Sequence, residues 1–166
     1  MRYYDLYESP QGQILLAATD RGIAGVYFAG QKYFPKDESE WRRDGRNALL
    51  RQAKRELAEY FSGTRKRFDV ALDASGTPFQ RAVWKAISTV AFGETISYGE
   101  LALRAGAAGR ARAVGAATGR NPIGIIVPCH RIVGANGNLT GYAGGLDRKR
   151  ALLALEAGQF ELRSAA

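Results

Sequence analysis

The sequence is poor in the residue types that form metal sites, disulfides and membrane segments. It has one cysteine, one histidine and one methionine among 166 residues. A zinc site needs three or four protein ligands, so no such site is expected, and one cysteine cannot form an intramolecular disulfide. The sequence has no apolar run near the roughly 20 residues of a membrane helix and no apolar signal segment at its start. We therefore expect no bound metal and a location in the reducing cytoplasm.

The only cysteine and the only histidine are neighbours, in the motif Pro128-Cys129-His130-Arg131. Cysteine attacks as the thiolate, and an adjacent base or positive charge lowers the thiol pKa toward neutrality. The alternative is a structural pair, a small apolar core residue beside a hydrogen-bonded imidazole. Residues 123–127 form a short apolar run between two prolines, which predicts a buried extended segment that ends at a turn. This placement favours a reactive centre at Cys129.

Positive charge is concentrated in the second part of the chain. The net charge is +8, with 18 arginines and 6 lysines. Residues 1–75 hold 13 basic and 11 acidic side chains, whereas the remaining residues hold 11 basic and 5 acidic. The planar arginine fork binds phosphate oxygens in pairs, so the second part is typical of a polyanion-binding domain. Nucleic acid is the favoured partner, although an arginine- and alanine-rich composition can also reflect a GC-rich genome.

The pattern of elements divides the chain into residues 1–75 and 76–166 and predicts an α+β protein. In the first part we expect three strands, at residues 3–7, 13–19 and 22–28. An amphipathic helix at residues 49–61, which stops at Gly63, and a return strand at residues 67–72 are expected to follow. The turn-like stretch at residues 73–76 is the predicted linker. This first part carries no recognisable chemical motif.

The second part is predicted to be mostly helical. Thr77-Pro78 is typical of a helix start, with Trp84 in the core, and Ser97 with Glu100 predicts a capped helix that ends near Gly106. A third helix is expected at residues 110–118, and two short helices around a tight turn indicate a helix-turn-helix. The third helix is almost bare of side chains, which suits either tight helix packing or close approach to a nucleic-acid groove. Further along, residues 136–137 (Asn-Gly) predict a hairpin turn.

Glu156 occupies a position that is unfavourable for a negative charge. It follows Leu152 and Leu153 by four and three positions, so it shares their inward helix face. It also lies near the helix C-terminus, where a negative charge costs about 0.3–1 kcal/mol. A cationic partner such as an imidazolium would explain its presence, and a solvated, frayed helix end is the alternative.

Several stretches of the second part form a specific combination of motifs. They are Phe92-Gly93-Glu94-Thr95-Ile96-Ser97-Tyr98, Arg112-Ala113-Val114-Gly115, Asn121-Pro122, Ile126-Val127-Pro128-Cys129-His130-Arg131 and Gly141-Tyr142-Ala143-Gly144-Gly145-Leu146. At these spacings residues 77–156 resemble the O6-alkylguanine-DNA alkyltransferases, whereas residues 1–75 resemble that family only in size and pattern. The resemblance implies a small RNase H-like α/β N-terminal domain. It also implies a mostly helical, winged-helix-like C-terminal domain with a helix-turn-helix.

The resemblance implies direct repair of double-stranded DNA without a cofactor. Cys129 would attack the alkyl carbon on O6 of guanine, and also on O4 of thymine, and keep the alkyl group as a thioether. His130 would take the thiol proton through a water, with Glu156 holding the imidazole, as in a hydrolytic triad. No second step releases a thioether, so each molecule would act once. The protein would be a monomer associated with the nucleoid, and cooperative assembly on DNA stays open.

Other site residues follow from the resemblance position by position. Asn121 would support the active-site loop, Tyr98 would protonate the departing guanine, and Arg112 would fill the gap left by an extruded nucleotide. The small residues that would enter the minor groove beside Tyr98 and Arg112 are Ala113, Gly115 and Ala116. The residues that would form the substrate pocket are Val127, Ile132, Tyr142, Ala143 and Gly144. Some family members have serine at the position of Ala143, and some bind zinc in the N-terminal domain, for which this chain lacks ligands.

Three other classes of protein are weighed against this interpretation. A non-catalytic protein that binds alkylated DNA would lack the reactive cysteine, which this chain has. A helix-turn-helix transcription factor would need side chains that read base edges, and the bare third helix offers few. A cysteine hydrolase would need an oxyanion hole and turnover, for which the sequence gives no sign. The alkyltransferase interpretation is therefore preferred.

Overall fold

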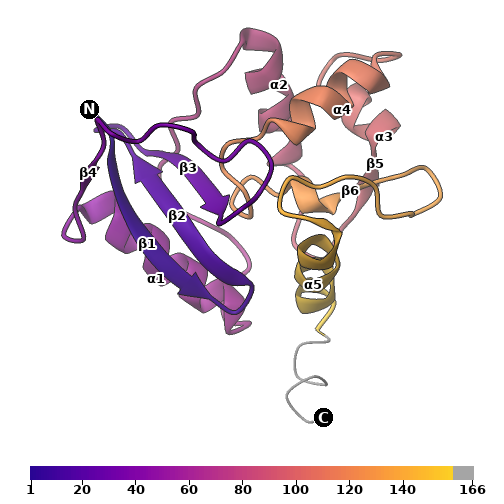
Figure 1. Ribbon diagram of the computed structural model, residues 1–166. Helices are drawn as coiled ribbons and strands as arrows, with labels where there is room; N and C mark the ends of the chain where they lie inside the picture. The colour runs from indigo at the N-terminus through magenta and orange to yellow at the C-terminus, as the bar shows by residue number, and fades with distance from the viewer. Residues whose placement is uncertain (159–166) are drawn as a thin grey trace. The chain divides into compact units, whose positions relative to one another are not determined.

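The computed structural model describes residues 1–158 and contains two compact units (Figure 1). The first unit is Met1–Ser75 together with Pro122–Ile126, and the second is Gly76–Asn121 together with the chain from Val127 onward. The chain thus returns to the first unit for five residues just before Cys129, which the sequence pattern does not predict. In the part of the chain that the structure describes, no helix is long and apolar enough to cross a membrane.

The first unit contains a four-stranded sheet with the strand order β3-β2-β1-β4. Its strands are β1 (Tyr3–Ser9), β2 (Gly12–Ala18), β3 (Ile23–Phe28) and β4 (Arg42–Arg43). β2 lies antiparallel to both β1 and β3, and β4 joins β1 in parallel. The three predicted strands are confirmed. β4 was not predicted, because it consists of two exposed arginines and so has no alternating apolar pattern.

Helix α1 (Ala48–Phe61) packs against this sheet and confirms the predicted helix. The Asn47 side chain caps its first turn, and Gly63, with a φ of 84°, follows its end. The predicted return strand at residues 67–72 is wrong, because only one isolated bridge forms there, between Leu72 and Ile23. The buried Glu56 carboxylate accepts from the backbone N–H groups of residues 69 and 70, at 2.8 and 3.1 Å. Those donors are therefore not available for a strand ladder.

Residues 123–127 are buried as expected, apart from the half-buried Gly124, but the prediction of an extended segment is wrong. Ile123 forms a single bridge to Val26 of β3, and the chain then turns, with a bond from the Ile126 N–H to the Gly124 carbonyl at 2.7 Å. Ile125 has a φ of 67° and is fully buried. A β-branched residue in this region costs about 1–3 kcal/mol and persists only where its surroundings fix it. A strained, buried turn therefore precedes the cysteine.

The second unit consists mainly of helices. Its elements are α2 (Pro78–Ile87), β5 (Ile96–Ser97), α3 (Tyr98–Arg104), α4 (Ala111–Gly119), a 3₁₀ turn (Cys129–Arg131), β6 (Ile132–Val133) and α5 (Leu146–Glu156). Thr77 and Gln80 form a reciprocal capping box at the start of α2, as the Thr-Pro pair predicts. Trp84 is in the core, and its indole N–H donates to the Ala117 carbonyl at 2.8 Å. This bond fixes α4 against α2. α3 also packs against α4, so the expected pair of short helices forms.

The predicted hairpin around residues 136–137 forms only its turn. The Gly134 N–H donates to the Asn138 carbonyl at 2.8 Å, and Gly137 has a φ of 78°. No strand follows at residues 139–140, and β6 instead pairs in parallel with β5, Ile132 opposite Ile96. The Ile132 carbonyl also accepts from the buried Lys149 ammonium at 2.6 Å. Both interactions involve β6, so the predicted turn at residues 136–137 is confirmed but does not join two paired strands.

Candidate active site

Cys129 begins the 3₁₀ turn of the second unit, immediately after Pro128. It is a free thiol and is 8% exposed. Its backbone N–H bonds to the Val127 carbonyl at 2.8 Å, which fixes the start of the turn. Burial raises the pKa of the Cys129 thiol, while a hydrogen bond from the Asn121 side chain and the positive charge of Lys149 oppose that rise. Because burial dominates, the thiol needs a base to become nucleophilic.

His130 and Glu156 form a fully buried pair. The distance between His130 Nε2 and Glu156 Oε2 is 2.7 Å. Although burial opposes ionisation, hydrogen bonds from His130 and Arg131 lower the pKa of Glu156 to about 2. The carboxylate can therefore only accept, which assigns the imidazole proton to Nε2 and leaves a lone pair on Nδ1. Burial also lowers the pKa of His130, so the ring is neutral and basic at Nδ1 near pH 7.

Nδ1 of His130 has no hydrogen-bond partner in the described residues, although it is buried. Buried polar atoms are nearly always bonded, so each exception calls for an explanation. Here the exception is Nδ1, which keeps a free lone pair because the proton of the neutral ring lies on Nε2 and is donated to Glu156. This arrangement leaves Nδ1 able to accept a proton, in the residue that directly follows Cys129.

Arg131 is a site residue that the sequence interpretation missed. Its Nε donates to Glu156 Oε1 at 2.8 Å and its Nη2 donates to Glu156 Oε2 at 3.0 Å, so the guanidinium binds both carboxylate oxygens. Its Nη1 donates to the Val90 carbonyl at 2.7 Å, and its guanidinium lies 5.8 Å from the centre of the Phe92 ring. Arg131 therefore fixes the carboxylate that fixes His130. Its position directly after the Cys-His pair is the signal that could have identified it.

Asn121 links the two ends of the segment that returns to the first unit. It is buried, and its Nδ2 donates to the Val127 carbonyl at 2.8 Å. This bond closes the loop just before the cysteine, while the same side chain bonds toward the thiol of Cys129. Asn121 thus combines support of the loop with a contact to the reactive sulfur.

Lys149 is the second site residue that the sequence interpretation missed. It is fully buried on α5, and its Nζ donates to the carbonyls of Ile132 and Thr140 at 2.6 and 3.1 Å. Burial lowers the pKa of Lys149, and the charge of Cys129 acts in the opposite direction. The Thr140 hydroxyl in turn donates to the Tyr98 hydroxyl at 3.1 Å. Lys149 therefore joins β6, the following loop and α3 around the thiol.

The outer face of α4 has few side chains of any size. Arg112 and Ala116 are exposed and Gly115 is half-buried, whereas Val114 and Ala117 form the buried side. The bare face is thus open to solvent and does not serve tight helix packing. Ala113 is also half-buried. A Cβ on Gly115 would lie 3.8 Å from the Tyr98 ring, at ordinary van der Waals contact, so the tyrosine adjoins this face of α4.

The predicted pocket residues come from three places in the second unit. Val127 precedes the cysteine, Ile132 begins β6, and the other three lie in the loop before α5. Val127, Ile132 and Gly144 are buried, while Tyr142 and Ala143 are half-buried. Burial raises the pKa of Tyr142 well above its usual value, as does the charge of Cys129, so the phenol remains protonated at neutral pH. Among the described residues, no group of three or more potential metal-binding side chains occurs.

Comparison with known protein families identifies the class to which this fold and site belong. Residues 2–74 match the ribonuclease-like domain of 6-O-methylguanine DNA methyltransferase, and residues 78–158 match the DNA-binding domain of the same class. The two matches span nearly the whole chain. The chain therefore belongs to the 6-O-methylguanine DNA methyltransferase family. The α+β fold with a ribonuclease-like first part and a DNA-binding second part is thus confirmed.

Individual relatives support this assignment along nearly their full length. The chain is 48% identical over 153 residues to a methylated-DNA–protein-cysteine methyltransferase of Mycolicibacterium paratuberculosis, covering 92% of this chain and 91% of the relative. It is 49% identical over 154 residues to a protein of the same name from Methanosarcina acetivorans, covering 93% and 97%. The crystal structure of Mycobacterium tuberculosis OGT in complex with DNA aligns with a TM-score of 0.87 at 46% identity, covering 95% of this chain and 94% of that one.

Proposed function

We propose that this protein repairs duplex DNA by moving the alkyl group of O6-alkylguanine irreversibly onto Cys129. The main support for the proposal is the buried imidazole of His130, the residue next to Cys129, whose Nδ1 has no partner in the described residues while Glu156 holds Nε2. In the reaction a bond forms between Sγ and the alkyl carbon, and the bond from that carbon to O6 breaks. One proton passes, in net terms, from the thiol to the released guanine. O4-alkylthymine offers the same kind of carbon–oxygen bond and is the second proposed substrate.

The proposed roles in proton transfer follow from the hydrogen bonds of the site. His130 Nδ1 takes the thiol proton through a water, and the resulting imidazolium is stabilised by the ionised Glu156. Asn121 holds the loop and bonds toward the sulfur. Tyr98, fixed by the Thr140 hydroxyl, protonates the departing guanine. The thioether has no leaving group that water could displace readily, so each molecule reacts once and needs no cofactor.

We propose that the bare face of α4 binds the minor groove. The exposed Arg112 and Ala116, with Ala113 and Gly115, allow the helix to approach the DNA closely. The alkyl carbon is inaccessible inside the base stack, so the nucleotide must leave the helix, and Arg112 occupies its place. Tyr98 adjoins this face at Gly115.

The extruded base is proposed to enter a pocket formed by the residues that surround the thiol. These are Val127, Ile132, Tyr142, Ala143 and Gly144. Alanine at position 143 has no side-chain hydroxyl, so backbone N–H groups of this loop would bind O6. The protonated Tyr142 provides a neutral aromatic wall for the base.

We further propose that residues 1–75 form the first domain and residues 76–166 form the second. Residues 122–126, which cluster with the first unit, are then a loop that belongs to the second domain. The end of the second domain lies outside the described residues. A cytoplasmic location near the nucleoid would give access to DNA and keep the thiol reduced. The protein is proposed to act as a monomer.

The substitution Cys129→Ala separates chemistry from binding. We expect this variant to transfer no alkyl group and to bind duplexes containing O6-methylguanine about as well as the wild type, because the DNA-contacting residues lie elsewhere. The measurements are alkyl transfer to protein by mass spectrometry and binding by fluorescence anisotropy. Loss of transfer and binding together would contradict this division of roles.

A further inference from the structure

The positive charge of the first 75 residues is confined to one short stretch. Residues 42–55, which cover β4 and the first half of α1, contain six basic residues and one acidic residue. The other 61 residues of this part contain seven basic and ten acidic residues. The small net charge of residues 1–75 is therefore the sum of a strongly positive stretch at residues 42–55 and a weakly negative charge on the other residues.

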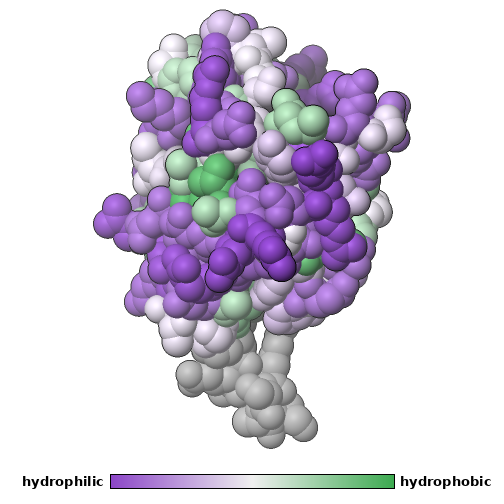
Figure 2. Space-filling view, turned by 90° about the vertical axis from the view of Figure 1, so that its left-hand side faces the viewer, coloured by the Kyte–Doolittle hydropathy of each residue, from purple (hydrophilic) through white to green (hydrophobic). Residues whose placement is uncertain are grey.

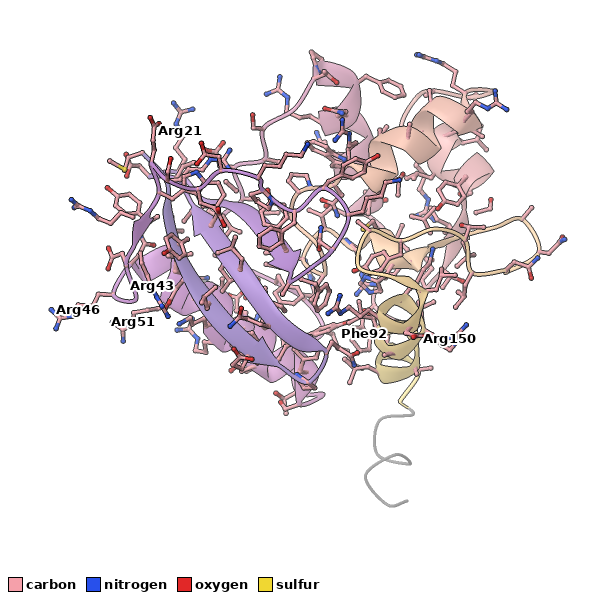
Figure 3. The ribbon with its side chains drawn as sticks, in the orientation of Figure 1. Arg21, Arg43, Arg46, Arg51, Phe92 and Arg150 are labelled. Atoms are coloured by element: carbon pink, nitrogen blue, oxygen red, sulfur yellow. The ribbon has the colours of Figure 1, made fainter. Side chains whose placement is uncertain are left out.

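The fold places this stretch on one surface, which we call the α1 patch, formed by Arg43, Arg46, Arg51, Lys54 and Arg55. Arg43 of β4 binds the buried Asp5 at 3.1 Å, and Lys54 of α1 binds the other oxygen of the same carboxylate. This shared partner brings β4 and α1 together. Figure 3 shows Arg43, Arg46 and Arg51 on the same side of the sheet and helix. The surface on this side is largely hydrophilic (Figure 2).

Most of the charge in the α1 patch is not neutralised by the protein. Arg46, Arg51 and Arg55 are exposed, and within residues 1–158 no ion pair or hydrogen bond involves their side chains. Arg51 and Arg55 are four positions apart on α1, where like charges repel and destabilise a helix. No ion pair or hydrogen bond within the described residues compensates these three guanidinium groups. A partner of opposite charge would explain them.

We propose that the α1 patch binds the phosphate backbone of duplex DNA, as a contact surface additional to α4. The inference rests on the proposed function, because the partner is the DNA that carries the alkylated base. Arginine forks bind phosphate oxygens in pairs, and one helical turn separates Arg51 from Arg55, about 5–6 Å between their Cβ atoms. That spacing allows two phosphates of one strand to be bound together. Contacts of this kind add affinity without sequence preference.

The test compares two triple variants that remove the same charge from the same unit. The patch variant is Arg46→Gln, Arg51→Gln and Arg55→Gln. The control variant is Arg21→Gln, Lys36→Gln and Arg67→Gln, at exposed positions outside the patch. The dissociation constant for a long unmodified duplex is measured for each protein across a series of salt concentrations. Thermal unfolding of each variant checks that the fold is retained.

For each phosphate contact that is lost, the slope of log K against log salt becomes less negative by about 0.9. We expect the slope of the patch variant to be less negative than that of the wild type by about 2–3, and its affinity at low salt to be roughly tenfold lower or more. The control variant should retain the wild-type slope. An unchanged slope in the patch variant would overturn the proposal. Equal changes in both variants would also overturn it, since they would reflect net charge alone.

Reaction with the free base O6-benzylguanine separates this inference from the proposed function. Neither triple variant changes a residue of the active site, so both should take up the benzyl group at the wild-type rate. Failure of the wild type itself to react would contradict the proposed alkyl transfer and leave the salt dependence as an independent result. A normal reaction with an unchanged slope would reject the α1 patch alone.

Discussion

Arg131 holds both oxygens of the Glu156 carboxylate, at 2.8 and 3.0 Å, and Glu156 in turn holds the imidazole of His130. The three side chains are almost completely buried, so each one depends on the others for its charge and orientation. Removing Glu156 or Arg131 would leave an uncompensated charge in the core. This chain of contacts determines which nitrogen of His130 is basic, and in the proposed reaction that nitrogen takes the proton of Cys129.

The substitution Glu156→Gln tests that chain of contacts. A neutral amide can donate as well as accept, so it no longer imposes the Nε2 proton and does not stabilise an imidazolium. We expect the rate of reaction with O6-benzylguanine to fall by about 10²- to 10⁴-fold, as when a triad loses its orienting carboxylate. Single-turnover kinetics measure the rate, and Glu100→Gln, at an exposed position, is the control. A wild-type rate in Glu156→Gln would remove Glu156 from the mechanism.

The substitution Arg112→Ala tests extrusion of the nucleotide. Loss of the side chain that is proposed to replace the base in the stack should slow repair of duplex O6-methylguanine by about 100-fold, equivalent to roughly 3 kcal/mol. Reaction with free O6-benzylguanine needs no extrusion and should be unchanged. Arg110→Ala removes the same charge from a side chain that instead stacks over Phe79. Equal losses on both substrates would exclude the proposed role of Arg112.

The substitution Lys149→Met tests whether the buried ammonium favours the thiolate. The apolar side chain has a similar length but no charge, so the pKa of Cys129 should rise further and the rate near pH 7 should fall about tenfold or more. The rate is measured against pH with O6-benzylguanine, and Lys149→Arg retains the charge for comparison. We expect the profile of Lys149→Met to move to higher pH. A lower rate at every pH with an unmoved profile would assign Lys149 a purely structural role.

Stability should decline in two steps as the solution is acidified. Burial lowers the folded-state pKa of His130, so the unfolded chain alone takes up a proton as pH falls through the usual histidine value of 6.5, and unfolding becomes easier. The pKa of Glu156 is about 2 in the folded state against 4.5 for a free side chain. Its contribution, on the order of 3 kcal/mol, is present above pH 4.5 and is lost between pH 4.5 and 2.

Urea unfolding at a series of pH values measures these two steps. His130→Asn should abolish the loss below pH 6.5, and Glu156→Gln should reduce the loss below pH 4.5. Burial of Asp5 raises the pKa of its carboxyl, but hydrogen bonds from Lys54, the Leu6 backbone and Arg43 outweigh this and lower it overall. Asp5 therefore also contributes to the loss of stability in the acidic range. A Glu156→Gln protein with the same acid profile as the wild type would contradict the lowered pKa of Glu156.

The sequence predicts correctly those elements whose signals, such as apolar spacing and helix capping, lie within a few neighbouring residues. The alternating strands, the Thr77-Pro78 helix start and the inward position of Glu156 follow from spacing and capping, and the structure has all three. Lys149 has no local signal, because it lies between Arg148 and Arg150 and looks like part of an exposed charged face. Its burial depends on carbonyls supplied by β6 and by the following loop.

The errors of the sequence interpretation have the same origin. The strained turn at Ile125 looks like a strand because its residues are apolar and β-branched, and only contacts with β3 determine its course. The basic surface on α1 is concealed in the sequence by acidic residues elsewhere in the first 75 residues. Both features depend on which segments the fold brings together.

The most direct test is the intact mass of the protein after incubation with a duplex that contains one O6-methylguanine. We expect a gain of one methyl group per molecule, mapped to Cys129, with no further reaction once each molecule has reacted. An unchanged mass with a reduced thiol and bound lesion would contradict it and indicate a protein that recognises the damage without chemistry. Continued release of methyl groups after the first equivalent would equally contradict a reaction that ends in a thioether.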